Sequence, residues 1–382
     1  MTRRIVVVGG GYAGVAFVRR MVARQKGAAI TLIDRNPYHT VLTEVHQVAA
    51  GNQPAHTFQV PFRDIPGVRF LQAEVTGLDG AGKTVQTSAG PVAYDVLVLA
   101  AGGVDTDFGV PGVKAHALML HSINDALAIA DKVAALPAGA PILIAGGGLT
   151  GVELAAELGE RFHGQGCVTL VEGAPSILPG LGAGVQVAAR RQLGALGVGV
   201  LTGKKIARVD EGRLHFADGG SLAFGLMVWA CGVRANPLMA TLGIPVDRAG
   251  RALVDANHKT ELEDVYVIGD CAAGNAPTAQ AAMQHGLALA DHLVALAGGR
   301  VEAMKPVKFR GTLVSLGQAL GAGQVGGLQL SGYMPGLMKR GNVARWLMLA
   351  AGLPAAVRYF LGLPAHAGKG HLPQNTAHTH GD

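Results

Sequence analysis

The clearest pattern in the chain is an apolar run, a glycine turn and then apolar residues at helical spacing, and it occurs twice. Ile5 to Val8 is apolar and β-branched, which predicts a strand covered on both faces. Positions 15–22 continue at helical spacing, and positions 30–33 predict the next strand. The second copy has the same three parts at positions 142–145, 152–158 and 167–171. The pattern predicts two strand–helix–strand units with parallel strands.

The glycines between the first strand and helix follow the GxGxxG spacing of a dinucleotide site. Gly9 permits a tight turn, Gly11 lets the backbone approach a pyrophosphate, and Gly14 lets helix and strand pack closely. Free N–H groups at the helix N-terminus would meet the phosphates. Asp34 follows the second strand, about 20 residues beyond Gly14, where a carboxylate can accept from a ribose hydroxyl.

The second copy repeats this chemistry with Gly146, Gly148, Gly151 and the acid Glu172. One such loop could be a glycine turn that binds nothing, but two loops with correctly spaced acids favour two dinucleotides. We expect FAD at one and a nicotinamide nucleotide at the other. A carboxylate at position 172 would repel a ribose 2′-phosphate, and the next two residues supply no arginine to bind one. This favours NADH over NADPH.

Further blocks resemble the two-dinucleotide flavoprotein oxidoreductases, and within them type II NADH dehydrogenase, over Arg4 to Leu363. "YDVLVLAAGG", positions 94–103, is similar to the strand and turn that close the first half of the flavin domain, with Ala101 and Gly102 at the turn. "VYVIGDCAAG", positions 265–274, resembles the second flavin motif. There the resemblance implies that Asp270, after Gly269, accepts from the ribityl chain.

Two more blocks of the resemblance concern the reacting groups. "EVHQVAAG", which begins at Glu44, resembles the loop at the flavin ring, and Glu153 matches a family carboxylate near the nicotinamide. "AQAAMQHG", positions 279–286, matches a quinone-site pattern of two glutamines. Gln280 and Gln284 are one helical turn apart, so they can offer amide donors to one quinone carbonyl. The alternative is a polar helix face turned to solvent. His285 departs from the family, which often has a second glutamine there.

The resemblance implies an α/β fold with two Rossmann-like domains, in which an NADH domain is inserted into an FAD domain. We place the FAD domain at 1–110 and 233–305, the NADH domain at 111–232, and a C-terminal region at 306–382 that ends in a disordered tail. The expected reaction passes two electrons from NADH through FAD to a quinone, without proton pumping. The cofactor carries that chemistry, while the protein positions the rings and excludes water.

The composition and charge of the chain limit the kinds of molecule that it is expected to bind. The chain carries a formal charge of +6 with 5% aromatic residues, and its Lys and Arg form no long runs. This suits phosphate cofactors or anionic lipid and argues against nucleic acid. The histidines of the tail could bind metal loosely, but we predict no metal site.

The number and spacing of the cysteines help to distinguish between related classes of oxidoreductase. Cys167, Cys231 and Cys271 are few and far apart, which indicates a reducing cytosolic compartment. Disulfide reductases need a CxxxxC on the first helix, and no cysteine precedes position 167. A sulfide:quinone reductase would need a cysteine pair beside the flavin, for which Cys231 and Cys271 are the candidates. A nucleotide-sensing flavoprotein without turnover is the third alternative.

The C-terminal region is expected to hold the protein on the membrane that contains the quinone. Its longest uncharged apolar stretch, 346–357, is too short to span a bilayer. Positions 333–363 mix apolar and basic residues, which predicts two or three short amphipathic helices on an anionic surface, at the cytoplasmic face of the cell membrane. The apolar and aromatic side chains expected there are Met334, Leu337, Met338, Trp346, Leu347, Leu349, Tyr359 and Phe360, and the cations are Lys339, Arg340, Arg345 and Arg358. Alternatively, these helices cover the flavin domain or form a homodimer contact.

Overall fold

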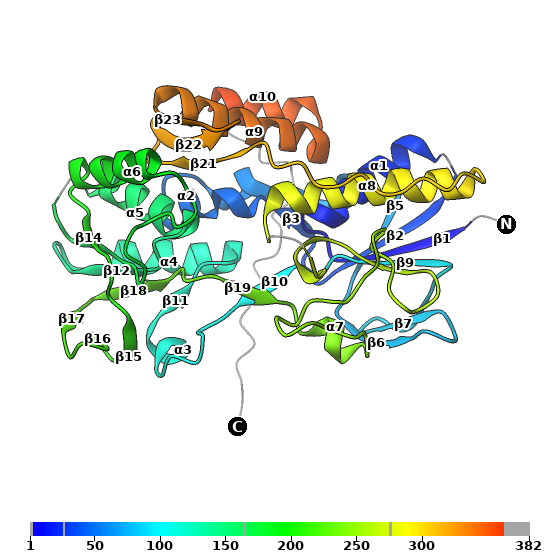
Figure 1. Ribbon diagram of the computed structural model, residues 1–382, viewed down its shortest axis with the longest axis horizontal. Helices are drawn as coiled ribbons and strands as arrows, with labels where there is room; N and C mark the ends of the chain where they lie inside the picture. Colours follow the sequence, from blue (N-terminus) through cyan, green and yellow to red (C-terminus); the bar gives the residue numbers. More distant parts are fainter. Residues whose placement is uncertain (1–2, 26, 163–164, 275–276, 363–382) are drawn as a thin grey trace.

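Two parallel five-stranded sheets with corresponding strand orders form the frame of the molecule (Figure 1). The structure is a computed structural model that describes residues 3–25, 27–162, 165–274 and 277–362. The order of the first sheet is β20 (Val265–Val267), β9 (Val96–Leu99), β1 (Arg4–Val8), β2 (Ala29–Asp34) and β5 (Val68–Gln72). The order of the second is β11 (Leu118–Met119), β18 (Leu226–Trp229), β12 (Ile142–Ala145), β13 (Val168–Val171) and β14 (Gly199–Leu201). In each sheet the strand before the glycine loop is central.

Helices cover the first sheet because each presents an apolar face to it. α1 (Tyr12–Arg24) follows the first glycine loop, and its buried side chains include Phe17 and Met21. It packs along α8 (Ala279–Ala297), where Gly286 leaves no room for a side chain: a Cβ there would lie 2.2 Å from the carbonyl oxygen of Ala13. This close approach brings the second flavin motif, which precedes α8, next to the first loop.

The second sheet is covered in the same way by α4 (Ile123–Ala135), α5 (Leu149–Arg161) and α6 (Ala183–Ala195). The short helix α2 (Val45–Ala49) belongs to the first part of the chain but packs against α4 and α5. The block that resembles the flavin-ring loop therefore lies at the junction of the two sheets.

Small antiparallel sheets complete the two domains. The chain leaves the first sheet through β10 (Gly103–Asp105) and returns through β19 (Val233–Ala235), and these two strands pair with each other. The remaining elements are β3 (Tyr38–Thr40) with β4 (Gln59–Pro61); β6 (Val75–Asp79), β7 (Thr84–Thr87) and β8 (Val92–Ala93); β15 (Ile206–Asp210), β16 (Arg213–Phe216) and β17 (Ser221–Ala223); and the short helices α3 (Val113–His116) and α7 (Leu238–Thr241).

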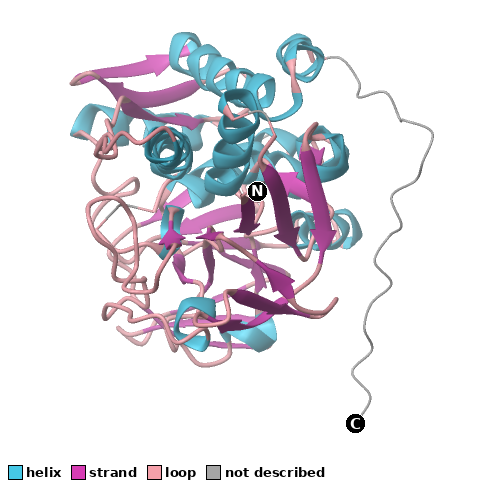
Figure 2. Ribbon diagram, turned by 90° about the vertical axis from the view of Figure 1, so that its right-hand side faces the viewer, coloured by secondary structure: helices cyan, strands magenta, loops and turns pink. Residues whose placement is uncertain are grey.

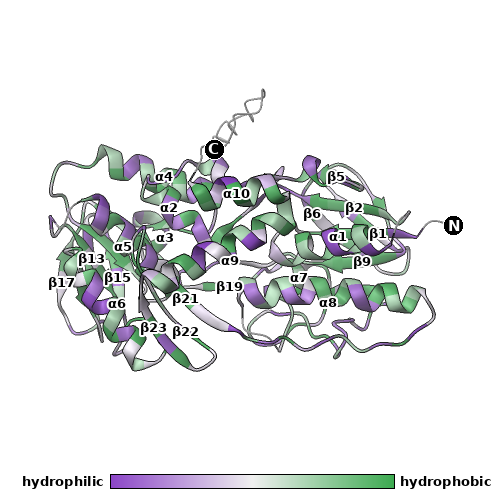
Figure 3. Cartoon of the chain, turned by 90° about the horizontal axis from the view of Figure 1, so that it is seen from above, coloured by the Kyte–Doolittle hydropathy of each residue, from purple (hydrophilic) through white to green (hydrophobic). Residues whose placement is uncertain are grey.

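The C-terminal region forms a layer of its own above both sheets (Figures 1 and 2). Three antiparallel strands, β21 (Gly311–Ser315), β22 (Gly321–Val325) and β23 (Leu328–Gly332), are followed by α9 (Tyr333–Ala351) and α10 (Leu353–Leu361). Seen from above, α9 and α10 lie over the junction between the two sheets (Figure 3). α9 contacts α1, while β22 and β23 contact α6.

The structure corrects the set of side chains expected at a membrane surface. Trp346 and Leu347 are buried, Tyr359 is partly buried, and the side chain of Lys339 is only 11% exposed. They face inward because α9 and α10 pack on the rest of the chain. For the inner face of these helices, the alternative prediction is therefore correct: they cover the flavin domain. Among the described residues, no helix is both long and apolar enough to cross a bilayer. The expected disordered tail lies outside the described residues.

Candidate active site

The first glycine loop is closed on every side except one. Gly9 has a φ of +99°, and a Cβ there would lie 2.4 Å from the carbonyl oxygen of Ala100. A Cβ at Gly14 would lie 2.0 Å from the carbonyl oxygen of Gly9, whereas a Cβ at Gly11 would meet nothing within 4 Å. The open side is therefore at Gly11, where α1 begins without a side-chain cap. Its free N–H groups and the space beside them fit a pyrophosphate.

The acid after the second strand is fixed against this loop. Asp34 accepts from the backbone N–H of Gly10 at 2.7 Å and from that of Asn36 at 2.8 Å. Burial raises the pKa of Asp34, and these two donors oppose the rise. Ala101 and Gly102 follow β9 beside the same turn. The carboxylate and the loop thus have the relation that a nucleotide ribose and its phosphates need.

The second loop has the same glycine geometry and the same kind of carboxylate contacts as the first. Gly146 has a φ of +107°, and a Cβ at Gly151 would lie 1.9 Å from its carbonyl oxygen. A Cβ at Gly148 would again meet nothing within 4 Å. Glu172 accepts from the backbone N–H of Gly147 and from that of Ala174, both at 2.6 Å. The residues of this loop fit a second dinucleotide.

The second flavin motif lies at the same edge of the first sheet. Gly269 and Asp270 follow β20, whose carboxyl end neighbours those of β9 and β1 in the parallel sheet. Burial raises the pKa of Asp270, while His121 and Arg251 lower it. Ligands of open α/β sheets bind beyond the carboxyl ends of the strands, so this position suits a carboxylate that contacts a bound dinucleotide.

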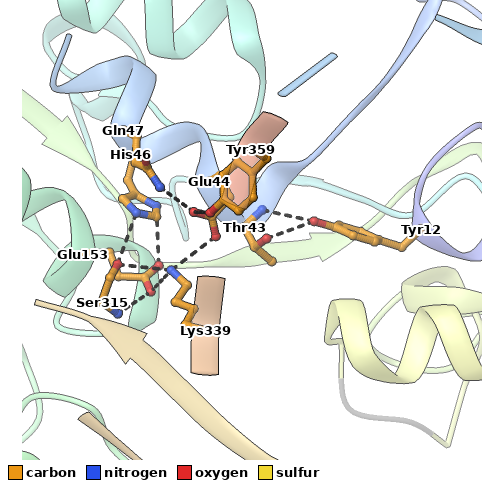
Figure 4. Close-up of polar contacts among 9 residues, drawn as sticks. All are labelled: Tyr12, Thr43, Glu44, His46, Gln47, Glu153, Ser315, Lys339 and Tyr359. Atoms are coloured by element: carbon orange, nitrogen blue, oxygen red, sulfur yellow. Dashed lines mark hydrogen bonds and ion pairs between the residues drawn. The ribbon is translucent and has the colours of Figure 1, made fainter. Parts of the chain in front are cut away.

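A buried ion cluster joins three parts of the chain: the segment before α2, the helix α5 of the second sheet, and α9 of the C-terminal region (Figure 4). Lys339 of α9 has its Nζ 2.5 Å from Oε1 of Glu153 and 3.4 Å from Oε1 of Glu44. Glu153 comes from α5, and Glu44 precedes α2. Burial alone would lower the pKa of Lys339, but the two carboxylates raise it above its usual value. Burial also raises the pKa of Glu44, and Lys339 opposes that rise.

Uncharged groups complete the cluster. Ser315 of β21 donates its backbone N–H to Glu153 at 3.0 Å, and Nζ of Lys339 donates to its Oγ at 3.1 Å. His46 lies beside Ser315 and Glu153: its Nε2 is 3.3 Å from Oγ of Ser315, and its Nδ1 is 3.6 Å from Oε2 of Glu153. Burial, and then the charge of Lys339, hold the pKa of His46 well below its usual value, so its ring is neutral. Sequence reasoning missed Ser315 and assigned Lys339 to lipid.

A polar cavity of about 130 Å³ opens beside the cluster. Its lining includes Glu44, Lys339, Tyr359 of α10, and Glu157. Glu157 is one turn beyond Glu153 on α5 and accepts from Nδ2 of Asn52 at 2.5 Å. Burial raises its pKa to about 7. The volume suffices for a few water molecules between ionisable groups.

The two glutamines lie on one face of α8 as expected, but both amides are paired within the chain. Gln280 accepts from the backbone N–H of Arg310 at 2.7 Å and donates to the carbonyl of Gly311 at 3.3 Å. Gln284 accepts from and donates to the backbone of Lys308, at 2.9 and 3.1 Å. They hold the segment that leads into β21, and their contact with a quinone stays a prediction.

The cysteines do not form a pair. Cys271 is buried between β9 and β20, where its Sγ donates to the carbonyl of Ile268 at 3.3 Å. Cys231 packs in a separate apolar cluster of the second sheet. Burial raises the pKa of Cys271 to about 11, and burial followed by Glu172 raises that of Cys231 to about 12. Both are protonated thiols, which does not suit a sulfur relay.

Two nucleotide loops that flank one buried ion cluster define a two-dinucleotide flavoprotein oxidoreductase. Residues 3–286 match the pyridine nucleotide-disulphide oxidoreductase family. The chain is 32% identical to a type II NADH:quinone oxidoreductase of Staphylococcus aureus, over 88% of this chain and 93% of that protein. It is 30% identical to an NADH dehydrogenase-like protein of Bacillus subtilis, over 89% and 97%. The chain belongs to the type II NADH:quinone oxidoreductases of that family.

Solved structures agree at the level of the fold. The NDH2 of Plasmodium falciparum in complex with NADH superposes with a TM-score of 0.83, at 18% identity, over 94% of this chain and 98% of that one. The sulfide:quinone oxidoreductase of Aquifex aeolicus gives a TM-score of 0.80, at 17% identity, over 92% of each chain. Because the fold is common to both activities, the site residues must distinguish them.

Proposed function

We infer that this protein passes two electrons from NADH through bound FAD to a quinone, without moving protons across a membrane. The observation that supports this most directly is the cluster of Glu44, Lys339 and Glu153, in which each residue comes from a different part of the chain and one buried cation serves two carboxylates. FAD, when bound, supplies the hydride acceptor and the electron transfer.

The residues of the chain have separable tasks in this proposal. The loop at Gly11 binds the FAD pyrophosphate, and Asp34 accepts from its ribose. The loop at Gly148 and the acid Glu172 do the same for NADH. Asp270 and Glu44 orient the flavin. These assignments rest on the open sides of the loops and on the positions of the acids.

Reduction of a quinone consumes two protons, and the cluster can hold one of them. Nζ of Lys339 carries a proton within hydrogen-bond distance of Oε1 of Glu153. The adjacent cavity, with Glu157 on its wall, gives water access to this pair. We assign Lys339 and Glu153 to holding a proton at the reacting edge, while α9 covers the site and excludes bulk water.

The outer face of α9 and α10 supports attachment to a membrane surface. Exposed apolar side chains recur along both helices at helical spacing, namely Tyr333, Met334, Leu337, Met348, Leu353, Val357, Phe360 and Leu361. We call this set the apolar stripe. Arg340 and Arg345 are also exposed on α9. An apolar stripe beside cations fits an anionic lipid surface, from which a quinone reaches the site below. We place this surface at the cytoplasmic face.

The decisive experiment separates the two half-reactions. The FAD-loaded protein is mixed anaerobically with NADH, and flavin absorbance is followed before and after addition of a soluble quinone. We expect bleaching by NADH and recovery on quinone. A flavin that stays reduced after quinone would support a nucleotide sensor instead. A flavin bleached by sulfide but not by NADH would support a sulfide:quinone reductase.

A further inference from the structure

Three aromatic rings join the FAD loop to the C-terminal helix α9. His39 of β3 lies with its ring centroid 5.0 Å from that of Tyr12 and 5.3 Å from that of Trp346. The rings of Tyr12 and Trp346 are 4.9 Å apart. All three side chains are buried. Tyr12 is the first residue of α1, whose N-terminus follows the loop of Gly9, Gly10 and Gly11.

The hydrogen bonds of His39 fix its tautomer. Its Nδ1 lies 2.9 Å from the carbonyl oxygen of Gly10, which can only accept, so Nδ1 must carry the proton. Its Nε2 lies 3.0 Å from Nε1 of Trp346, which can only donate, so Nε2 must accept. Both ring nitrogens are satisfied only in the neutral Nδ1–H form.

We propose that His39 is a positioning residue for FAD: it holds the carbonyl of Gly10 and so sets the pyrophosphate loop, and Trp346 of α9 keeps it in the required tautomer. The loop is fixed from two sides, since the N–H of Gly10 donates to Asp34 while its carbonyl accepts from His39. A change in the direction of this peptide would turn the N–H groups that face the phosphates. The C-terminal helix thereby contributes to FAD affinity from outside the FAD domain.

Other contacts keep this arrangement in place at neutral pH. Arg19 of α1 donates to the carbonyl of Leu349 at 2.8 Å, which ties α9 to α1. Burial lowers the pKa of His39 to about 4, and the Gly10 carbonyl opposes this shift. The facing titratable group is Tyr12, whose hydroxyl is bonded to Thr43 and whose pKa burial raises to about 12. Both groups are therefore neutral over the working range of pH.

The test uses the two tryptophans of the chain as a matched pair. Trp346→Phe removes the indole N–H that fixes His39, and Trp229→Phe removes the indole N–H of a tryptophan in β18 of the second sheet, which donates to the carbonyl of Thr106 at 2.9 Å. Each ring is about 5% exposed or less. FAD affinity is measured by titrating apoprotein and following the quenching of flavin fluorescence. We expect Trp346→Phe to raise the Kd for FAD about tenfold, as loss of one buried hydrogen bond allows, and Trp229→Phe to leave it within about twofold.

Variants of His39 separate positioning from general stability. His39→Asn keeps an amide that can donate to Gly10 and should retain more FAD than His39→Leu, which cannot donate. Tm is measured with and without the same excess of FAD, because a change in FAD affinity alters the gap between the two values whereas a loss of general stability lowers both. Equal FAD affinity in Trp346→Phe and the wild type would overturn the proposal, as would an unchanged Tm gap in His39→Leu. This inference rests on FAD binding at the first loop; a wild type that binds no FAD would instead refute the proposed function.

Discussion

At the scale of single residues, Lys339 determines whether the acids of the site can be buried together. Two carboxylates in an apolar setting repel each other and lose hydration, and one cation between them offsets both effects. Glu44 is 2% exposed and Glu153 is 6% exposed, so little solvent screening remains. The lysine is thus a structural requirement of the cluster as well as the proton holder that we propose.

Removing the charge of Lys339 should destabilise the folded protein. We expect Lys339→Met to lower the free energy of unfolding by about 3–5 kcal/mol, as when one partner of a buried ion pair is removed. The matched control is Lys204→Met, whose pair with Asp218 is at the surface and should contribute less than about 1 kcal/mol. Urea unfolding of both variants checks this. Equal losses would show that the Lys339 cluster is not effectively buried.

Glu157 gives a prediction for pH. Its folded pKa of about 7 exceeds the ordinary value of 4.5, so the native state holds its proton more tightly than the unfolded state. Its contribution to stability is therefore complete below pH 4.5 and is lost as pH rises through 7, by roughly 3 kcal/mol at most. Glu157→Gln keeps a hydrogen bond to Asn52 without the titration. The fall in Tm between pH 5 and 8 should be smaller in this variant; an identical fall would assign the dependence to another group.

At the scale of elements, α9 shows what periodicity can and cannot predict. Its apolar residues suggested one lipid face, but the helix is apolar on two faces. The inner face carries Val343, Trp346 and Leu347 against the protein, and the outer face carries Leu337 and Met348. Which face stays exposed depends on what the rest of the chain packs beneath the helix, and the sequence of the helix alone does not contain that information. A deletion after Gly332 would thus remove Lys339 and Trp346 together with the apolar stripe.

Point substitutions on the outer face avoid this problem. Leu337→Ser with Leu353→Ser removes two apolar side chains that are 51% and 62% exposed, so the fold should be kept while flotation with anionic vesicles weakens several-fold. The control pair, Leu127→Ser with Leu253→Ser, changes leucines that are 41% and 50% exposed elsewhere. Unchanged flotation of the first pair would contradict lipid contact. A dimer that this pair converts to monomers would indicate a homodimer contact instead.

At the scale of the whole molecule, the duplicated nucleotide unit was predictable and its junction was not. Strands, loops and acids of both units follow from local patterns, because each glycine and carboxylate acts within one strand–helix–strand segment. The ion cluster joins positions 44, 153, 315 and 339, and no local spacing marks residues so far apart as neighbours. The contact between His39 and Trp346, which are 307 positions apart, was not predictable for the same reason. The limits at residues 110, 232 and 305 and the roles of the site residues remain predictions.

The position of Lys339 far downstream of Glu44 and Glu153 in the sequence has a consequence for biosynthesis. A ribosome delivers Glu44 and Glu153 long before their shared cation, since translation proceeds from the N-terminus at about 5–20 residues per second. Until α9 emerges, the two carboxylates lack both their counter-charge and the helix that covers them. The ion cluster is therefore completed only when α9, which also carries part of the apolar stripe, has been made. Completion of the cluster and synthesis of the apolar stripe therefore fall in the same late stage of translation.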